Sequence, residues 1–391
     1  MHEGTDPIIF YIFAIFAGSA VLATVALYAR QALIVGYILM GILIGPHGLH
    51  LINNTDLISA IADIGIIFLL FLLGLHLQPQ DLLNLLRKTT VLTLVSSLIF
   101  GILGFLVGII FQFTLIESII IGVTVIFSST IIGLKLLPTT VLHHKHAGEI
   151  IISILLFQDL LAILALLIVQ GWGKGGSPLF EVAKLTLSLP FLVVFALAFE
   201  HYILIKLIRR FDKIQEYIFL MTIGWCLGMA EMAHALGLSY EIGAFLGGVV
   251  LASSPIALYI AESLKPLRDF FLVMFFFTLG AKFDLSVLST VFIPAITLAA
   301  IVLFIKPFVF KYLLVKLGEP SNLSLEMGVR LGQISEFSLL IAVVALESSV
   351  ISDNASFLIQ TATILTFIFS SYYIVMTYPT PVALSDKLRR D

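Results

Sequence analysis

Hydrophobic residues form long unbroken stretches that are separated by short polar segments. A helix that crosses a bilayer needs about 20 consecutive apolar residues. Thirteen stretches meet this requirement, at approximately residues 8–28, 32–51, 57–76, 90–111, 116–137, 149–170, 185–207, 216–236, 240–259, 269–287, 290–312, 323–347 and 355–378. The pattern predicts an all-α polytopic membrane protein with thirteen transmembrane helices.

Composition agrees with this interpretation. Hydrophobic residues make up 60% of the 391 residues and charged residues only 12%, and the mean hydropathy is +1.13. These values lie outside the range of soluble domains. The lipid bilayer is therefore the expected surroundings, and the net charge of −3 gives no sign of a nucleic-acid partner. The single cysteine, Cys226, excludes an intrachain disulfide and a cysteine-based metal cluster.

Basic residues are distributed unevenly between the predicted loops. One alternating set of loops, with the C-terminal tail, contains sixteen of the 21 Lys and Arg residues, whereas the opposite set contains only Lys174, Lys184 and Lys282. Basic residues are concentrated in cytoplasmic loops. The distribution predicts an N-terminus outside and a C-terminus in the cytoplasm, as an odd number of spans requires.

Two of the spans contain polar clusters that disfavour a regular helix. The fifth has Ser128, Ser129 and Thr130 at its middle, and the twelfth has Gly332, Gln333, Ser335 and Glu336. Short hydroxyl side chains compete with helical hydrogen bonds, and glycine lowers helix propensity. We expect two broken helices. The alternative is two ordinary helices whose hydroxyls bond back by one turn.

The positions of these two spans suggest an internal repeat. They are seven spans apart, so they cross the membrane in opposite directions. Spans two to six and nine to thirteen then form two inverted five-helix repeats with two crossing broken helices. Secondary transporters with such repeats bind substrate at the bilayer midplane, between the discontinuous helices.

One acidic residue, Asp159, lies near the middle of the sixth span, directly after the first predicted break. A charge at that depth costs roughly 3 kcal/mol on insertion scales, and ionisable residues there mark ion or proton pathways. Gln158 can supply a carbonyl oxygen without a second charge. The oxygens of Ser128, Ser129 and Thr130 suit a hard monovalent cation. We expect these five residues to bind a cation.

Two basic residues also lie within predicted spans. Lys306 could pair with Asp159 when no cation is bound, or it could extend toward the cytoplasmic surface beside Lys311. Glu336 could bond backbone freed in the twelfth span or pair with Arg330. Gln333, Ser335, Glu336 and Arg330 are therefore interpreted as support for the broken helix.

Several stretches give the chain a resemblance to Kef-type bacterial potassium/proton antiporters, within the monovalent cation/proton antiporter superfamily. They are 63–83, Phe127-Ser-Ser-Thr, Leu156-Phe-Gln-Asp-Leu and 234–255, supported by 302–314 and 332–337. His76 and Ile334-Ser335 depart from the family pattern.

The resemblance implies an ion-binding core of about 90–207 and 290–378 and a dimerisation scaffold of about 8–76 and 216–287. It also implies a homodimer in a bacterial inner membrane and an elevator-like movement of the core. Electrogenic relatives carry two Asp residues in place of Gln158-Asp159, so the Gln-Asp pair suggests electroneutral exchange, with potassium or sodium as substrate and no cofactor. Most Kef proteins also have a cytosolic nucleotide-binding regulatory domain, which is a possible partner and is absent from this chain.

Other functions are less consistent with the sequence. A sodium/proton antiporter of the same fold stays open, and a channel would require a repeated filter motif that the chain lacks. An aspartyl protease needs two carboxylates that share a site, but Asp159 is the only Asp deep in a span. An enzyme is therefore not expected. His143, His144 and His146 lie in a cytoplasmic loop, where they could sense pH or bind metal or simply be solvated. Gly171–Gly176 matches a dinucleotide fingerprint but follows no strand.

Overall fold

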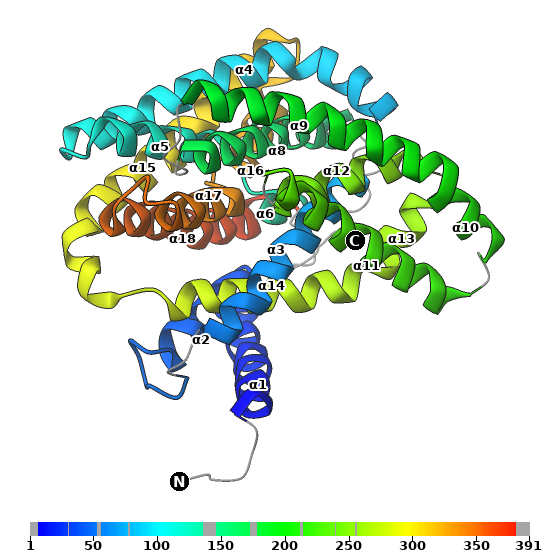
Figure 1. The fold of residues 1–391 in the computed structure, drawn as a ribbon. Coiled ribbons are helices and arrows are strands. Elements are labelled where there is room, and N and C mark those ends of the chain that lie inside the picture. Colours follow the sequence, from blue (N-terminus) through cyan, green and yellow to red (C-terminus); the bar gives the residue numbers. More distant parts are fainter. Residues whose placement is uncertain are drawn as a thin grey trace. The chain divides into compact units, whose positions relative to one another are not determined.

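The computed structural model describes residues 7–380 except for 30, 53–55, 77–78, 136–145, 173–177, 212–213, 239 and 255. The described residues form helices and no β-strand (Figure 1). His143 and His144 lie outside them, as do most of the loop that matches the dinucleotide fingerprint and the tail 381–391. The all-helical class predicted from the sequence is confirmed.

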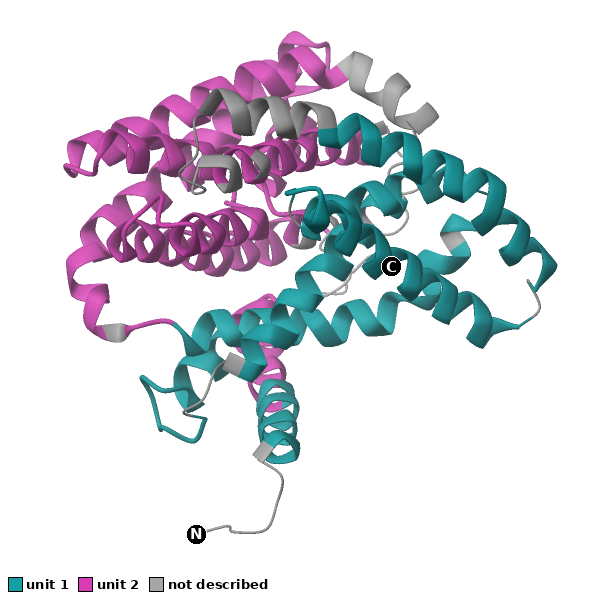
Figure 2. Cartoon of the chain, in the orientation of Figure 1, with its two compact units in different colours: residues 1–20, 37–83, 174–282 teal, residues 21–36, 84–173, 283–391 magenta. Residues whose placement is uncertain are grey.

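Contacts between Cα atoms divide the chain into two compact units, which Figure 2 shows in two colours. Unit 1 comprises 1–20, 37–83 and 174–282, and unit 2 comprises 21–36, 84–173 and 283–391. The division falls within α1 (Pro7–Tyr28) and α2 (Leu33–Ile44). Residues 174–207, which the sequence analysis assigned to the core, belong to unit 1 with the predicted scaffold helices. The functional roles of the two units stay predictions.

Unit 1 is held together by helices that approach each other through glycine. A Cβ on Gly74 of α3 would collide with the carbonyl oxygen of Phe245 on α12, and one on Gly248 of α12 with that of Phe71. Backbones this close allow extensive van der Waals contact, which drives helix association in lipid. The helices of this unit are α3 (Asp56–His76), α9 (Pro178–Phe199), the π-helical turn Glu200–Leu204, α10 (Ile205–Arg210), α11 (Gln215–Ala235), α12 (Tyr240–Ala252), α13 (Ala257–Ser263) and α14 (Lys265–Ala281).

Unit 2 contains all the residues expected to bind the cation. Its helices are most of α4 (Pro79–Ile110), α5 (Leu115–Ile126), α6 (Thr130–Lys135), α8 (His146–Trp172), α15 (Leu285–Lys316), α16 (Ser321–Arg330), α17 (Glu336–Glu347) and α18 (Asp353–Thr377). The α15 helix packs along both α16 and α18, and α17 contacts α5, α8 and α18. The polar groups of the next subsection are therefore enclosed by helices of one unit.

Both predicted helix breaks are present. Residues 127–129 separate α5 from α6, and residues 331–335 separate α16 from α17. In each break a serine caps the helix that follows. The hydroxyl of Ser129 accepts a hydrogen bond from the Ile132 amide at 3.1 Å, and that of Ser335 accepts one from the Phe337 amide at 3.1 Å. The hydroxyl clusters therefore start new helices, as N-cap residues do, rather than bonding back within continuous ones.

The number of membrane crossings does not follow from the helices alone. Six described helices are long and apolar enough to cross a bilayer, and five more are apolar but shorter. The α2 helix has 12 residues, or about 18 Å, against a hydrocarbon core of ~30 Å. The predicted span 240–259 is also divided, because α12 ends at Ala252 and α13 begins at Ala257. The count of thirteen and the inverted repeat stay predictions.

Two helices are longer than their hydrophobic stretches suggested. The α4 helix begins at Pro79 rather than near residue 90, and α15 continues to Lys316, past the predicted end near residue 312. Each has 32 residues, or about 48 Å. Hydropathy marks only the part of a helix in contact with lipid, whereas the backbone hydrogen bonds continue into polar sequence. Proline at the first helical position suits the start of α4.

Candidate functional site

The central residue of the site is Asp159, on α8. Its side chain is 1% exposed. Neither carboxylate oxygen has a hydrogen-bond partner among the residues that the structure describes. A buried polar group without a partner is costly and calls for an explanation, such as a bound ion. Asp159 is therefore a strong candidate for a group whose partner is a cation or a proton.

The side chain of the preceding residue on α8, Gln158, bonds to backbone groups at the first helix break. Its carbonyl oxygen Oε1 accepts a hydrogen bond from the Ser128 amide at 3.0 Å, and its Nε2 donates to the Ile126 carbonyl at 3.1 Å. These two backbone groups lose their helical partners where α5 ends. The side chain must both accept and donate here, which a carboxamide can do and a carboxylate cannot. Gln158 therefore supports the break, and its Oε1 is already engaged.

The three hydroxyl groups of the first break differ in their environments. Ser128 Oγ donates to the Leu331 carbonyl at 2.8 Å, across to the second break, while Ser129 Oγ caps α6. Thr130 Oγ1 has no hydrogen-bond partner among the described residues. Of the five predicted cation ligands, Asp159 and Thr130 thus keep side-chain oxygens that form no hydrogen bond within the part of the chain that the structure describes.

The second break is filled by Gln333. Its Nε2 donates to the Arg330 carbonyl at 2.9 Å and, at 3.4 Å, to the Ser129 carbonyl of the first break, while its Oε1 accepts from Ser370 at 3.1 Å. The next amide, of Ile334, donates to Thr366 Oγ1 at 3.2 Å. Each break therefore has a glutamine that bonds freed backbone groups, and the two breaks are bonded to each other.

Lys306, on α15, connects the two breaks directly. It is 1% exposed, and its Nζ donates to the carbonyls of Phe127 at 3.0 Å and Gln333 at 3.2 Å. The ring of Phe100 lies 5.0 Å from Nζ, which is within the range of a cation–π contact. Phe127 is the C-cap residue of α5, and carbonyls at a helix C-terminus carry partial negative charge. The ammonium thus neutralises carbonyl dipoles from both broken helices.

The predicted ion pair between Lys306 and Asp159 is not present in this structure. No salt bridge joins the two side chains, both of which belong to the described residues. Extension toward the surface is also not seen, because the lysine is buried. Both charges lie in unit 2, but the sequence could not indicate that backbone carbonyls would bind the ammonium.

The remaining predicted residues lie at the ends of α16 and α17. Arg330, which ends α16, forms its ion pair with Glu326 at 2.8 Å and donates to the Pro379 carbonyl at 2.9 Å. That pair links positions on one helix, and the predicted pair with Glu336 stays a prediction. Glu336 begins α17 and is partly exposed. Gly328 allows α16 to approach α15, since a Cβ there would collide with the carbonyl oxygen of Pro307.

Sequence reasoning missed the contribution of α18. Ser356, Gln360, Thr363, Thr366 and Ser370 are all buried on this helix. Their spacing of three or four residues places them on one face. Thr366 and Ser370 support the second break through the bonds to Ile334 and Gln333. A buried polar stripe in an otherwise apolar span was the signal that could have identified them.

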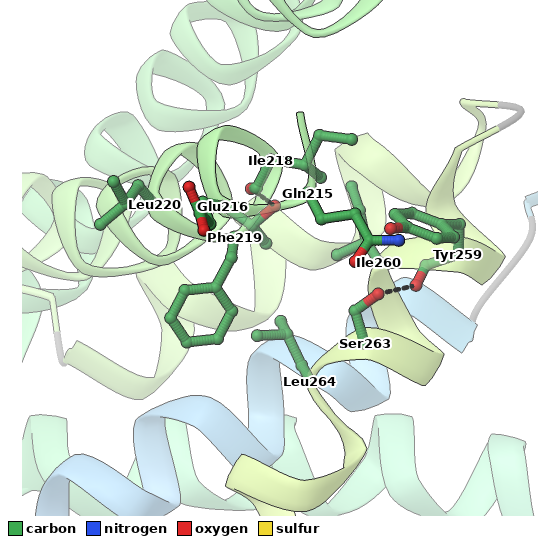
Figure 3. A pocket seen from close by; sticks show the side chains of 10 residues that line it. Gln215, Glu216, Ile218, Phe219, Leu220, Tyr259, Ile260, Ser263 and Leu264 are labelled. Carbon is green, nitrogen blue, oxygen red and sulfur yellow. Dashed lines mark hydrogen bonds between the residues drawn. The ribbon is translucent and has the colours of Figure 1, made fainter. Parts of the chain in front are cut away.

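The cavity shown in Figure 3 is not part of this site. It has a volume of about 470 Å³ and lies in unit 1, between the start of α11 and α13. Ile218, Phe219, Leu220 and Ile260 give it a largely apolar lining, and the one hydrogen bond drawn there joins Ser263 Oγ to the Tyr259 carbonyl at 2.8 Å. None of the predicted cation ligands lines it.

A buried carboxylate beside two mutually bonded helix breaks is the arrangement of a secondary transporter. Comparison with known proteins agrees. The chain belongs to the sodium/hydrogen exchanger family, whose transmembrane region matches residues 12–377. It is therefore a membrane protein of a cation/proton antiporter family rather than an enzyme family. The superfamily inferred from the sequence is confirmed, while the Kef branch is not distinguished.

Three comparisons with individual proteins show similarity at low to moderate sequence identity. The chain is 30% identical over 356 residues to the iron transporter MagA of Paramagnetospirillum magneticum, an alignment that covers 88% of this chain and 80% of that protein. The sodium/proton antiporter MjNhaP1 of Methanocaldococcus jannaschii is similar in structure. At pH 8 it gives a TM-score of 0.71 at 17% identity over 94% of this chain and 97% of that chain. A structure of MjNhaP1 from an electron-microscopy map gives 0.61 at 16% identity, over 94% and 93%. These two matches establish the fold.

Proposed function

We propose that this protein exchanges a monovalent cation, preferably potassium, for protons, without net movement of charge. Cation and proton compete for Asp159, which binds one or the other and never both. That competition is sufficient to couple the two fluxes. The Kef-like Gln-Asp pair, rather than the Asp-Asp pair of electrogenic relatives, is the reason for preferring potassium and electroneutral exchange.

The observation that carries the proposal is the contrast between engaged and unengaged oxygens. Gln158, Ser128 and Ser129 are committed to backbone groups and to each other. Among the described residues, neither buried carboxylate oxygen of Asp159 has a hydrogen-bond partner, and the same holds for the hydroxyl oxygen of Thr130 on α6. A partly dehydrated cation requires oxygen ligands of this kind. We propose that Asp159 and Thr130 bind it, and that the other three hold the break in shape.

The charge balance follows from the same contacts. Gln158 is neutral, so it adds no second negative charge to the site. One carboxylate then binds one monovalent cation or one proton. Lys306 remains bonded to the Phe127 and Gln333 carbonyls during both halves of the cycle, since it does not need to be displaced from Asp159.

The larger assembly is proposed on the strength of the family resemblance. Thirteen helices cross the bacterial inner membrane in two inverted five-helix repeats, with the N-terminus outside. Two copies form a dimer, and the unit that contains Asp159 moves against a scaffold in an elevator-like cycle. A cytosolic nucleotide-binding domain or subunit would regulate it.

The alternatives differ in the transported ion or in the type of flux. A sodium/proton exchanger would share every structural feature above, and the relative named as an iron transporter makes iron another cargo to test. A potassium channel would also place oxygens at broken helices, but it would pass current without coupled proton movement. Only transport measurements separate these functions.

The deciding experiment is proton flux in proteoliposomes that contain the purified protein and an internal pH-sensitive dye. Potassium, sodium, rubidium, lithium and ferrous iron are added in turn to the same vesicles. We expect potassium to drive saturable proton release and Asp159→Asn to abolish it. The variant should still elute at the wild-type volume in size-exclusion chromatography and show a cooperative unfolding transition. Exchange at the wild-type rate by Asp159→Asn would disprove the site, and unitary currents with no proton flux would favour the channel.

A further inference from the structure

A second buried carboxylate in unit 2 lies at the opposite end of α5 from the first break. Glu117 is in the first turn of α5, and its residue is 7% exposed. Its Oε2 accepts hydrogen bonds from the amide of Thr114 at 2.9 Å and from the Thr114 hydroxyl at 2.8 Å. The Thr114 hydroxyl in turn accepts from the Glu117 amide at 3.3 Å. This is a capping box, which satisfies free amides at a helix N-terminus.

The other oxygen of Glu117 reaches a different helix. Oε1 accepts hydrogen bonds from the amide of Ser352 at 3.0 Å and from its hydroxyl. Ser352 is the N-cap residue of α18, and its hydroxyl also accepts from the Ala355 amide at 3.5 Å. One carboxylate therefore binds the N-termini of both α5 and α18. We refer to Thr114, Glu117 and Ser352 as the α5–α18 junction.

An ordinary helix cap does not need this second connection. A capping box is complete within α5, yet Glu117 also lies where two positive helix ends converge, and a negative charge near each is favourable. All four of its contacts are charge-assisted hydrogen bonds, which are roughly twice as strong as neutral ones. Because each carboxylate oxygen already accepts two hydrogen bonds, Glu117 is not itself available as a cation ligand. The junction fixes how far α5 and α18 can slide past each other.

That relative position matters because each helix supports one break. Ten residues after Glu117, or about 15 Å along α5, the Phe127 carbonyl binds Lys306. On α18, Thr366 and Ser370 bond the Ile334 amide and the Gln333 side chain of the second break. The two breaks must remain aligned for Lys306 and Ser128 to contact both. Sliding of one helix along the other would strain these contacts.

We propose that Glu117 is a positioning residue for transport, which sets the alignment of the two helix breaks through the α5–α18 junction and thereby the affinity for the cation. The inference rests on the proposed function at Asp159. It adds a residue that touches neither the cation nor the proton. Loss of Glu117 should raise the KM for the cation, because misaligned breaks shift the positions of the oxygens around the site. The rate at which the whole unit moves should change less.

The surroundings of Glu117 suggest a competing explanation that the test must exclude. A cavity of about 470 Å³, lined by Gln112, Glu117, Thr290 and Ser352 among others, lies beside the junction. A negative charge next to a cavity could simply raise the local cation concentration. The chain offers a matched control for that effect in Asp353, an exposed acidic residue in the first turn of α18 that follows Ser352.

The experiment compares Glu117→Gln, Ser352→Ala, their double variant and Asp353→Asn in the proteoliposome assay, with KM and maximal rate measured for the cation that drives exchange. Glu117→Gln should raise KM about fivefold, or roughly 1 kcal/mol, with a much smaller change in maximal rate. Ser352→Ala, which keeps the charge of Glu117, should raise KM in the same direction. The double variant should be no worse than Glu117→Gln alone, because both changes break one junction. Asp353→Asn should leave KM unchanged.

The outcomes separate this inference from the function on which it rests. If Glu117→Gln lowers only thermal stability and KM is unchanged, the residue is a cap and nothing more. If Asp353→Asn raises KM as much as Glu117→Gln, the effect is one of surface charge and the inference is wrong. Should Glu117→Gln not fold, Ser352→Ala against Asp353→Asn decides the question in the same way. Normal exchange by Asp159→Asn would instead refute the proposed function itself.

Discussion

Replacement of Lys306 by glutamine tests the most consequential difference between the sequence and the structure. The sequence suggested an ion pair with Asp159, whereas the structure bonds the ammonium to the Phe127 and Gln333 carbonyls. Lys306→Gln removes the charge and keeps much of the volume. Both contacts are weakened, since glutamine is one bond shorter and its neutral amide donates weaker hydrogen bonds than an ammonium.

The expected loss of stability can be worked from these contacts. A hydrogen bond to a charged group contributes about 1.5–3 kcal/mol, so two contribute roughly 3–6 kcal/mol. Removing a buried ammonium also recovers a desolvation cost of several kcal/mol. We expect a net loss of about 1–3 kcal/mol, seen as a lower Tm of the purified protein in detergent. Lys311→Gln, on the same helix but only partly buried, is the control and should change stability by no more than about 0.5 kcal/mol.

The double variant with Asp159→Asn distinguishes the two arrangements. Contacting charges show coupling of about 0.5–3 kcal/mol in a double-mutant cycle, whereas independent sites add to within about 0.5 kcal/mol. Because no ion pair joins the side chains, we expect the two effects on stability to be additive. Coupling above about 1 kcal/mol would show that Lys306 and Asp159 interact directly, and it would refute the conclusion that the carbonyls are the partners of the ammonium.

Three further predictions concern the same unit. Gln158→Glu keeps the acceptor for Ser128 but loses the donor to the Ile126 carbonyl, so it should cost about 1–3 kcal/mol of stability, whereas an unchanged Tm would contradict the supporting role of the amide. Gly328→Ala should lower stability by about 1–3 kcal/mol, because its Cβ meets the Pro307 carbonyl; Gly224→Ala, where no atom lies within 4 Å of a new Cβ, is the control, and equal Tm values for the two would argue against close packing of α15 and α16. Exchange by the wild-type protein should not respond to an imposed potential of ~100 mV, which acts with about 2.3 kcal/mol on each net charge moved; a reversal point that follows voltage would rule out electroneutral exchange.

The sequence predicted the features that have strong local signals. Serine and glycine clusters in the middle of apolar stretches indicated both breaks. An isolated carboxylate within a span made Asp159 the candidate cation ligand, because burial of a charge there has few explanations. The superfamily was also recognisable from the order of several motifs. For the breaks and for Asp159 the physical cause acts within a few residues of the chain.

Partner choice was not predictable, because it depends on contacts between distant segments. Nothing near Lys306 in the sequence indicates that carbonyls of two other segments will reach its ammonium. Thr366 and Ser370 were missed for the same reason, since a hydroxyl in a membrane helix usually bonds its own backbone. The extent of α4 was underestimated because a helix continues past the apolar stretch by which it was recognised.

The hydrogen bonds of the first break also set an order of events during synthesis. The Phe127 carbonyl receives its donor from Lys306, 179 residues later, and Ser128 finds its acceptor on Leu331, 203 residues later. At a synthesis rate of about 5–20 residues per second, the first of these intervals is roughly 9–36 s. An unsatisfied backbone group in the bilayer core costs several kcal/mol. The first break therefore cannot obtain all of its native partners when its own segment is made, and the cation site is completed only after α15 and the second break have been synthesised.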